Sequence, residues 1–315
     1  MVWFKFSLCW SLLFAATFFP MKAAGKDSLL VVFWNLENYF DWKQDTMFVR
    51  QHWSKRKFMV KSRAIAKAVL WIADEEGRLP DAIGVAEVEN RFALESLVRD
   101  TPLSKAGYGI VHYDSPDPRG IDVALLYRKA TLKQLRASPV RIENGTGPPI
   151  KTRDILLAEF LLSDGDSLAF LVNHHPSKYG GGSSFRRKVA MERLRETTDS
   201  LFSEGWQNIV SMGDFNDTPE STEEYSRIML NLAGPLASKG MGTIKYSGKW
   251  EMIDMFFISP SLVKRNPGVR MKIEKIPFLM LRDNAHSGEK PFRTFSGPTY
   301  SGGVSDHCPI ALMIQ

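Results

Sequence analysis

Short apolar segments recur along the whole chain and alternate with polar stretches. They are rich in β-branched and aromatic residues, as strands buried on both faces are. Turn-rich stretches such as 115–120 and 163–166 join neighbouring segments and favour hairpins. We therefore expect strands at 29–35, 81–90, 109–114, 121–128, 155–162, 167–175, 208–214, 251–259 and 308–314.

Three segments show helical patterning instead. In 56–73 the side chains of Ile65, Val69 and Ile72 fall on one face, 91–100 reads as a short helix, and 183–204 is charged and free of glycine. No repeat and no shift in composition marks a boundary. Because strands outnumber helices, we expect one α/β domain over 26–315, with two sheets packed together and helices outside.

The first residues have the pattern of an export signal. Lys5 precedes an apolar run from Phe6 to Pro20, and small residues follow at 23–25. We expect cleavage near residue 25 and an exported mature chain. The alternative is an uncleaved anchor, but the run is shorter than the ~20 residues of a membrane span and no second apolar run follows. Stable membrane insertion after cleavage is therefore not expected.

Composition excludes disorder and narrows the chemistry. The chain has 315 residues, of which 44% are hydrophobic and 24% charged, enough for a large buried core. Residues 1–25 hold two lysines and no acid, so cleavage lowers the formal charge from +6 to +4. That mild excess suits a polyanionic substrate and an ordinary surface equally. Cys308 remains as the only thiol, which excludes an internal disulfide and zinc sites built on cysteine.

Polar residues that a core does not use stand at the ends of the apolar segments. Any one is ordinary in a turn, but together they indicate ligand or catalytic positions. They are Asn35, Glu37, Glu87, Glu89, Asn173, His174, Asp214, Asn216, Asp254, Asp306 and His307. Oxygen ligands of these types suit Mg²⁺, Mn²⁺ or Ca²⁺, and the histidines suit proton transfer. The chain has no GxxxxGK[ST] loop and no GxSxG elbow, so metal-assisted hydrolysis of a phosphate ester is the chemistry that remains.

The same residues form six ordered motifs: "WNLEN" at 34–38, "AEVEN" at 86–90, "VNHHPS" at 172–177, "GDFND" at 213–217, "IDMFFIS" at 253–259 and "SDH" at 305–307. This order resembles the endonuclease/exonuclease/phosphatase superfamily, the DNase I-like fold, over residues 29–315. The resemblance implies a four-layered α/β sandwich of two packed mixed β-sheets flanked by helices. It also implies a divalent cofactor, Mg²⁺ or Mn²⁺.

The resemblance implies two groups of site residues. Asn35 and Glu87 are similar to the family's metal-binding pair, Glu37 assists through water, and Asp306 lies beside the metal. The catalytic group comprises a histidine on the scissile phosphate, an acid that orients or deprotonates the attacking water, an asparagine that holds the phosphate, and a second histidine whose ring an aspartate fixes. In that order they are His174, Asp214, Asn216, His307 and Asp254.

Substrate contacts are less determined. Arg119, Lys178, Arg293 and Tyr300 stand in loops near the motifs and are candidates for phosphate or base contacts, although each also fits a plain turn or surface position. His175 points away from His174 in an extended segment, so we expect a structural role for it. The remaining histidines, His52, His112 and His286, belong to no motif.

Three functions of different classes remain open, because one fold serves many substrates. The first is an exported metal-dependent nuclease or related phosphodiesterase. The second is a phosphatase, or a phosphodiesterase that acts on phospholipid or inositol phosphate. The third is a non-catalytic binding protein, and it is disfavoured because no core motif residue is missing. We expect the first, with nucleic acid or another phosphate ester as partner and a monomeric chain.

Overall fold

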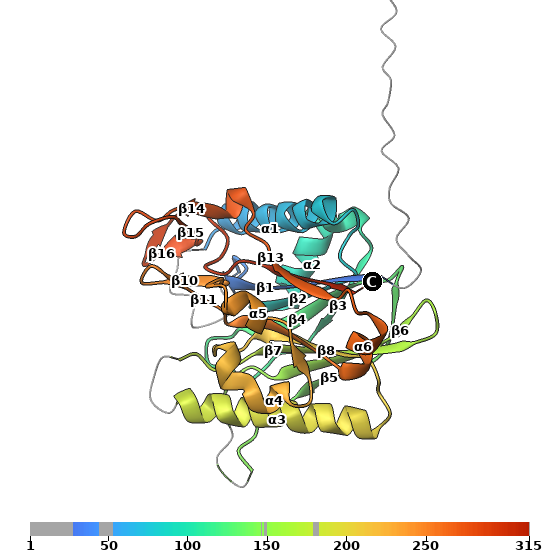
Figure 1. The fold of residues 1–315 in the computed structure, drawn as a ribbon. Helices are drawn as coiled ribbons and strands as arrows, with labels where there is room; N and C mark the ends of the chain where they lie inside the picture. The colour runs from blue at the N-terminus through green and yellow to red at the C-terminus, as the bar shows by residue number, and fades with distance from the viewer. Residues whose placement is uncertain (1–27, 44–52, 146, 148–149, 179–182, 315) are drawn as a thin grey trace, which may run out of the picture.

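Two packed six-stranded sheets with helices on their outer faces make up the fold in a computed structural model of the protein (Figure 1). The structure describes residues 28–43, 53–145, 147, 150–178 and 183–314. The expected signal peptide, 1–25, lies outside the described residues, as does His52. Within the described helices, none has the length and apolar character needed to cross a membrane.

The first sheet carries the N-terminal motifs and is mixed. Its strand order is β13 (Arg270–Ile273), β18 (Ile310–Ile314), β1 (Leu29–Tyr39), β2 (Ala82–Val88), β4 (Asp122–Arg128) and β3 (Tyr108–His112). Only β1 and β2 run parallel. Its outer face is covered by α1 (Lys55–Glu75), α2 (Arg91–Arg99) and the 3₁₀ turn η1 (Pro102–Lys105). Ser54 and Asn90 cap α1 and α2, because their side chains accept hydrogen bonds from backbone N–H groups of the first turns.

The second sheet carries the histidine and GDFND motifs. Its order is β5 (Leu132–Val140), β6 (Ile155–Leu162), β7 (Ser167–His174), β8 (Ile209–Asp214), β12 (Asp254–Ile258) and β9 (Leu230–Asn231), with only β7 and β8 parallel. The helical segments on this side are α3 (Ser183–Ser203), η2 (Pro219–Thr222), α4 (Glu223–Ser226), α5 (Gly234–Ala237) and α6 (Pro260–Arg265). The predicted four-layered α/β sandwich is confirmed.

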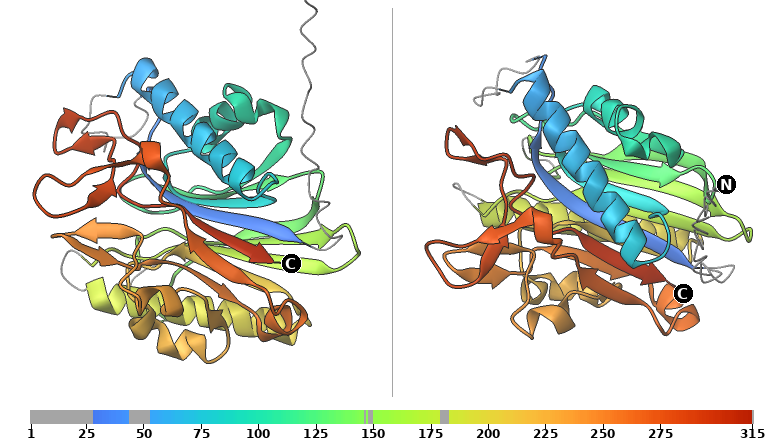
Figure 2. Two further views of the ribbon diagram at one scale, coloured as in Figure 1. Left: turned by 45° about the horizontal axis from the view of Figure 1, so that its top comes forward. Right: turned by 90° about the horizontal axis from the view of Figure 1, so that it is seen from above.

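Three small hairpins lie together at one end of the sandwich, where Figure 2 shows them beside the ends of the central strands. They pair β10 (Ile244–Tyr246) with β11 (Lys249–Glu251), β14 (Met280–Arg282) with β15 (Glu289–Pro291), and β16 (Phe295–Ser296) with β17 (Thr299–Tyr300). The 3₁₀ turn η3 (Pro277–Leu279) leads into β14. Apart from Glu251, the residues of these hairpins lie outside the segments that the sequence predicts as strands.

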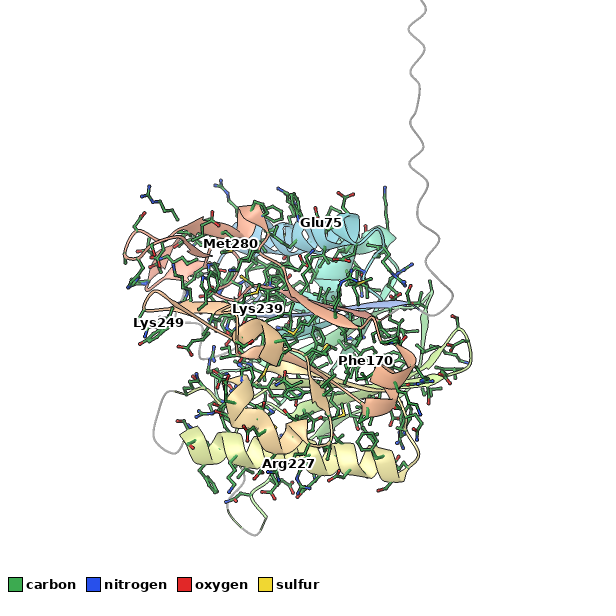
Figure 3. The ribbon with its side chains drawn as sticks, viewed as in Figure 1. Glu75, Phe170, Arg227, Lys239, Lys249 and Met280 are labelled. Atoms are coloured by element: carbon green, nitrogen blue, oxygen red, sulfur yellow. The ribbon has the colours of Figure 1, made fainter. Side chains whose placement is uncertain are left out.

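Strand β1 shows why its segment is apolar throughout. Leu29, Val31 and Phe33 face the second sheet, and the residues between them pack under α1 and α2. Figure 3 shows side chains filling both layers of packing, with Phe170 inside and Glu75 at the outer surface. A strand buried on both faces gains from every apolar side chain, about 1.5–3 kcal/mol for a fully buried large one. Burial of both faces explains why apolar and polar residues do not alternate along the sequence of β1.

Exposed strands are the ones that the sequence leaves unpredicted. Strand β5 lies at the edge of the second sheet, and most of its side chains face solvent. It therefore lacks the apolar run on which prediction depends. The segment predicted as one strand at 251–259 divides instead: Glu251 ends the β10–β11 hairpin and β12 begins at Asp254. The break allows Asp254 to stand at the end of a central strand.

Candidate active site

A cleft of about 350 Å³ opens where strands of both sheets end beside the hairpins. Most residues that the sequence predicts for the site line it. They come from seven separate parts of the chain: Asn35, Glu37, Glu87, Arg119, His174, Asp214, Asn216, Arg293, Asp306 and His307. Asp254, another of the predicted strand-end residues, is not part of this lining but contacts the ring of His307. The antiparallel pairing of β8 with β12 places Asp254 opposite Asp214.

His307 is held in one position by its neighbours. Its Nδ1 lies 2.8 Å from Oδ2 of Asp254, its backbone N–H donates to Ser305, and its carbonyl accepts from the indole of Trp34. Burial alone would lower the pKa of His307, but the carboxylates of Asp254, Asp214 and Asp306 outweigh burial and raise the pKa well above its ordinary value. The ring is therefore an imidazolium at neutral pH.

Asp214 faces this imidazolium across the cleft floor. Its Oδ2 lies 3.8 Å from Nε2 of His307 and accepts a 3.0 Å hydrogen bond from Asn35, while Oδ1 accepts from the backbone N–H of Asn216. Burial raises the pKa of Asp214 to about 7, against the influence of His307. Gly213 permits the close approach of β7, because a Cβ there would lie 2.4 Å from a backbone oxygen of Asn173.

His174 lies on the same side of the cleft as His307 and Asp214. We call this side, with Asp254 behind it, the histidine wall. Nε2 of His174 lies 3.6 Å from Oδ2 of Asp214 and 3.9 Å from Oε1 of Glu87. Burial, with the positive charges of Arg153 and Arg119, holds the pKa of His174 well below its ordinary range. The two cleft histidines thus differ in charge: His174 is neutral and His307 is cationic.

Sequence reasoning missed Arg153, the buried residue that positions His174. Its guanidinium donates to the backbone carbonyls of His174 and His175 and pairs with Asp117 at 2.8 Å. The ring of His175 packs edge-on against Phe215, 5.0 Å between centroids, and does not line the cleft. That placement agrees with the structural role expected for His175.

The opposite wall of the cleft is acidic and carries two arginines. Arg293 donates to Oε1 of Glu37 at 2.7 Å and lies 3.2 Å from Asp306, and Arg119 lies 3.1 Å from Glu87. Burial and the charge of Asp306 raise the pKa of Glu37 to about 7, despite Arg293 and Lys61 nearby. Both arginine side chains are about half exposed.

Lys61 lies beneath this acidic wall and was also missed from sequence. It is fully buried and donates to the carbonyl of Glu37 at 2.5 Å and to the hydroxyl of Thr294 at 2.8 Å. Burial lowers its pKa to about 8. The signal in the sequence is a lysine beside Phe58, Ser62 and Ile65 on the buried face of α1, where a charged residue needs a partner.

Backbone conformation singles out the same cleft. Among described residues other than glycine, five have positive φ, and four of these line the cleft: Glu37, Asn38, Glu87 and Asn216, at 47°, 52°, 60° and 49°. Such conformations cost of order 1–3 kcal/mol each and gather at functional sites. Glu37, Asn38 and Glu87 lie where the pairing register shifts near the ends of β1 and β2, and Asn216 lies just after β8.

The acidic wall fits a hard divalent cation. Asn35, Glu37, Glu87 and Asp306 present oxygen donors to one cleft, and such donors are the ligands that hard divalent cations prefer. A second set of possible ligands, Asp214, Asp254 and His307, has donor atoms within 4.8 Å of one another. Protonated His307 has no lone pair to offer, so the acidic wall is the better match.

The structure places two predicted substrate contacts outside the cleft lining. Lys178 pairs with Glu251 at 2.9 Å, and Tyr300 packs against Phe295 with 5.4 Å between ring centroids. Arg119 and Arg293 do line the cleft. His286 lies 3.4 Å from Asp283 on the β14–β15 connection, outside the cleft lining.

Comparison with known proteins gives a family and a fold. A model of the Endonuclease/Exonuclease/phosphatase family matches residues 30–315. Truncated Caenorhabditis elegans TDP2 superposes with a TM-score of 0.60 at 15% identity, covering 91% of this chain and 97% of that chain. Bacteroides thetaiotaomicron mannosyl-6-phosphatase Bt3783 gives 0.59 at 15%, covering 91% and 100%.

A third structure, Danio rerio TDP2 complexed with a single-strand DNA product, gives a TM-score of 0.56 at 14% identity and covers 91% of this chain and 99% of that chain. At such identities these structures show a shared fold. No curated protein matches the chain.

Proposed function

Since this chain belongs to the endonuclease/exonuclease/phosphatase family, we propose that it is an exported, monomeric, metal-dependent phosphodiesterase that hydrolyses nucleic acid. The observation that carries the proposal is the arrangement of Asp254, His307 and Asp214. It places a cationic imidazole opposite a carboxyl whose pKa is about 7. That pairing supplies a base and a compensating positive charge at one phosphate-sized position.

Asp214 is the base in this proposal. A general base works best when its pKa lies near the operating pH, and burial brings the pKa of Asp214 there. Hydrogen bonds from Asn35 and the backbone of Asn216 fix the orientation of the carboxyl. Asp214 accepts a proton of the attacking water as the water oxygen bonds to phosphorus. The phosphorus–oxygen bond on the far side of the phosphate breaks, and the leaving oxygen takes a proton from solvent water.

The two histidines stabilise the charge that the phosphate develops. His307 donates from Nε2 as an imidazolium that Asp254 keeps protonated, and neutral His174 donates from its own Nε2 on the facing strand. Asn216 is anchored through a hydrogen bond to the carbonyl of His175 and holds the phosphate beside them. Because both histidines are buried and all three groups are held by hydrogen bonds or packing, they need little reorganisation as charge develops.

Asn35, Glu37, Glu87 and Asp306 are the residues that would hold Mg²⁺ or Mn²⁺. When bound, such a cation neutralises phosphate charge and lowers the pKa of coordinated water. Arg293 and Arg119 reach the same acids. Their exposed side chains can turn from the carboxylates to a substrate phosphate.

A phosphatase acting on a small phosphomonoester is the second candidate, and one observation favours it. Lysines at the cleft rim are already paired: Lys245 and Lys290 with Asp283, each at 3.2 Å, and Lys178 with Glu251. Among the described cations, Arg119 and Arg293 pair instead with acids of the proposed metal site, so a bound metal ion would release these two arginines to one phosphate position. The fold neighbours, in their own printed names, include both a DNA-product complex and a mannosyl-6-phosphatase.

Purified mature chain would be assayed on plasmid DNA, RNA, an abasic duplex, bis-p-nitrophenyl phosphate and mannose 6-phosphate, with Mg²⁺ or Mn²⁺ and with chelator. We expect chelator-sensitive nicking that His307→Ala reduces by roughly 10²- to 10⁴-fold, the range for loss of a group that transfers or compensates charge. His286→Ala, on the β14–β15 connection, is the matched control and should keep full activity. Turnover of only the monoester would replace the nuclease proposal with the second candidate.

A further inference from the structure

A second group of metal-ligating side chains lies at the junction of β3 and β4, away from the residues that line the catalytic cleft. His112, Asp114 and Asp122 each offer a ligand atom, and these atoms lie within 4.8 Å of one another. Nε2 of His112 is 3.2 Å from Oδ2 of Asp122, a separation typical of two donors on one small cation. His112 belongs to no motif of the family resemblance.

A buried carboxylate without a hydrogen-bond partner, Asp154, lies near this group, because it lines one cavity with Ser115, which hydrogen-bonds Asp122. The side chain of Asp154 is 6% exposed, and neither of its oxygens accepts a hydrogen bond. Arg141, itself 45% exposed, approaches only to 3.5 Å. A cation bound nearby would compensate this buried carboxylate, which has no hydrogen-bond partner of its own.

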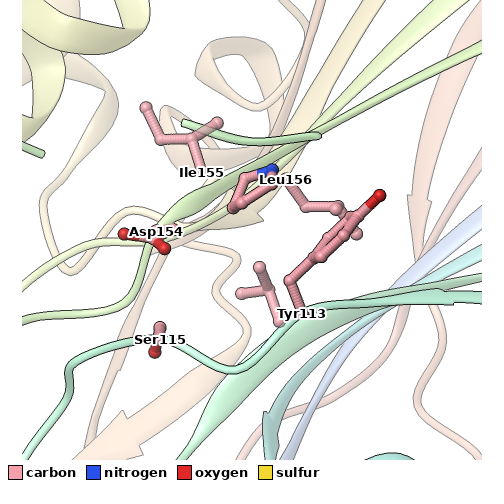
Figure 4. A pocket seen from close by; sticks show the side chains of 7 residues that line it. Tyr113, Ser115, Asp154, Ile155 and Leu156 are labelled. Atoms are coloured by element: carbon pink, nitrogen blue, oxygen red, sulfur yellow. The ribbon is translucent and has the colours of Figure 1, made fainter. Parts of the chain in front are cut away.

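A small cavity brings Asp154 next to Ser115, the residue that hydrogen-bonds Asp122. Figure 4 shows Asp154 and Ser115 lining the same pocket, with Tyr113 and Ile155 around it. Its volume is about 10 Å³, close to what one water molecule needs. Ser115 donates to Oδ1 of Asp122 through both its N–H and its hydroxyl, at 2.8 and 2.5 Å. This leaves Oδ2 of Asp122 directed at His112.

We propose that His112, Asp114 and Asp122, with Asp154 beside them, bind one divalent transition cation of the zinc or manganese class. One imidazole nitrogen together with carboxylate oxygens suits these ions, whereas Ca²⁺ and Mg²⁺ favour oxygen ligands alone. Its ligands are distinct from the residues of the proposed hydrolytic site, since none of them lines the catalytic cleft.

Binding there would act on the segment that carries Arg119. Residues 113–121 begin beside His112 and end at Asp122, so both ends of the segment adjoin the site. Between them, Asp117 pairs with buried Arg153 and Arg119 reaches Glu87. A cation at the base of the segment would restrict its motion and hold Arg119 over the cleft.

Zn²⁺ titration by calorimetry, in a Glu87→Gln background that weakens the catalytic cation site, tests the proposal. We expect about one equivalent to bind, with at least tenfold weaker affinity in Asp114→Asn and in His112→Gln. Asp114 is exposed, so its substitution leaves the fold intact. Asp164→Asn, at the exposed β6–β7 turn, is the matched control and should bind as the background does.

Two further measurements test whether His112 is a ligand and whether metal binding restricts the segment that carries Arg119. Co²⁺ should give visible absorption bands whose position shifts on loss of the His112 nitrogen. Zn²⁺ should slow tryptic cleavage after Arg119 severalfold in the parent chain and leave the rate unchanged in Asp114→Asn. Unaltered Zn²⁺ affinity in both site variants, or tighter binding of Ca²⁺ than of Zn²⁺, would overturn the proposal. Neither readout depends on catalysis. The proposal of a second metal site can therefore be rejected without rejecting the hydrolase function, and the reverse also holds.

Discussion

The two walls of the cleft differ in how their charges are compensated. On the histidine wall, the charges of Asp214, Asp254 and His307 are buried, with no side chain more than 9% exposed. On the acidic wall, Glu37, Glu87 and Asp306 are compensated by arginines whose side chains are 46% and 55% exposed. One wall is therefore fixed by its packing and the other can rearrange.

The energetic consequences of that difference are distinct. Removing one partner of a buried pair leaves an uncompensated charge and costs about 3–5 kcal/mol, whereas exposed pairs contribute about 0–1 kcal/mol. The histidine wall is thus suited to chemistry that needs fixed protonation states. The acidic wall is suited to exchanging its cations, from arginine to metal and from carboxylate to substrate phosphate.

Asp254→Asn should give the largest effect, because it removes the charge that keeps His307 protonated. We expect kcat to fall by roughly 10²- to 10⁴-fold. The pKa of His307 should fall as well, which moves the alkaline limb of the kcat/KM profile to lower pH. The profile would be measured on bis-p-nitrophenyl phosphate from pH 5 to 10.

Asp199→Asn, which alters an exposed carboxylate on α3, is the control for that substitution and should leave both the rate and the profile unchanged. A slow Asp254→Asn enzyme whose alkaline limb has not moved would mean that Asp254 only orients the ring. The histidine wall would then be fixed in geometry but not in charge.

Arg293→Gln should strengthen the binding of the metal ion and weaken the binding of the substrate. Arg293 contacts both Glu37 and Asp306, so its loss frees two carboxylates for a cation. We expect about tenfold tighter Mg²⁺ activation and about tenfold higher KM, each equivalent to ~1.4 kcal/mol. Arg119→Gln, which frees only Glu87, should shift Mg²⁺ activation less.

Mg²⁺ dependence of initial rates at fixed substrate, then substrate dependence at saturating Mg²⁺, separates the two effects. Lys249→Gln, an exposed cation on β11, controls for a general change in charge. Weaker Mg²⁺ activation in Arg293→Gln would show that the arginine supports the metal site instead of competing with it, and the acidic wall would then be as fixed as the histidine wall.

The sequence was informative where burial is complete. Strands β1, β2, β7 and β8 are apolar because both faces are buried, and their polar ends then stand out against the apolar runs. The edge strand β5 and the small hairpins carry no such contrast. Their course depends on contacts with distant parts of the chain, which local patterning does not contain.

The same limit applies to the site. Site residues at strand ends can be predicted from the sequence because the strands bring them to one edge. Lys178 and Tyr300 are predicted from loops instead, and they lie outside the cleft lining. Arg153 and Lys61 were missed because each acts through backbone carbonyls of distant segments. A buried hydrogen bond to another segment's backbone leaves no spacing signal in the sequence.

The smallest expected effect concerns stability and tests whether burial sets the charge of Asp214. Its folded pKa, about 7, lies above the ordinary carboxyl value of 3.8, so the folded state holds a proton that the unfolded state has lost between those pH values. Stability from this group is complete below about pH 4 and is lost as pH rises to 7. Asn at this position has no proton to lose.

The melting temperature of Asp214→Asn, relative to the parent chain in chelator, should therefore be higher at pH 8 than at pH 5, by roughly 2–4 °C for each kcal/mol of lost repulsion. The hydrogen bond from Asn35 that the substitution disturbs is lost at both pH values, and His307 keeps Asp254 in both proteins. Asp199→Asn should show no such change. An equal difference in melting temperature at pH 5 and pH 8 would mean that Asp214 is ionised at both pH values, because His307 stabilises its charge more strongly than burial opposes it. The histidine wall would then contain a permanent ion pair in place of a base.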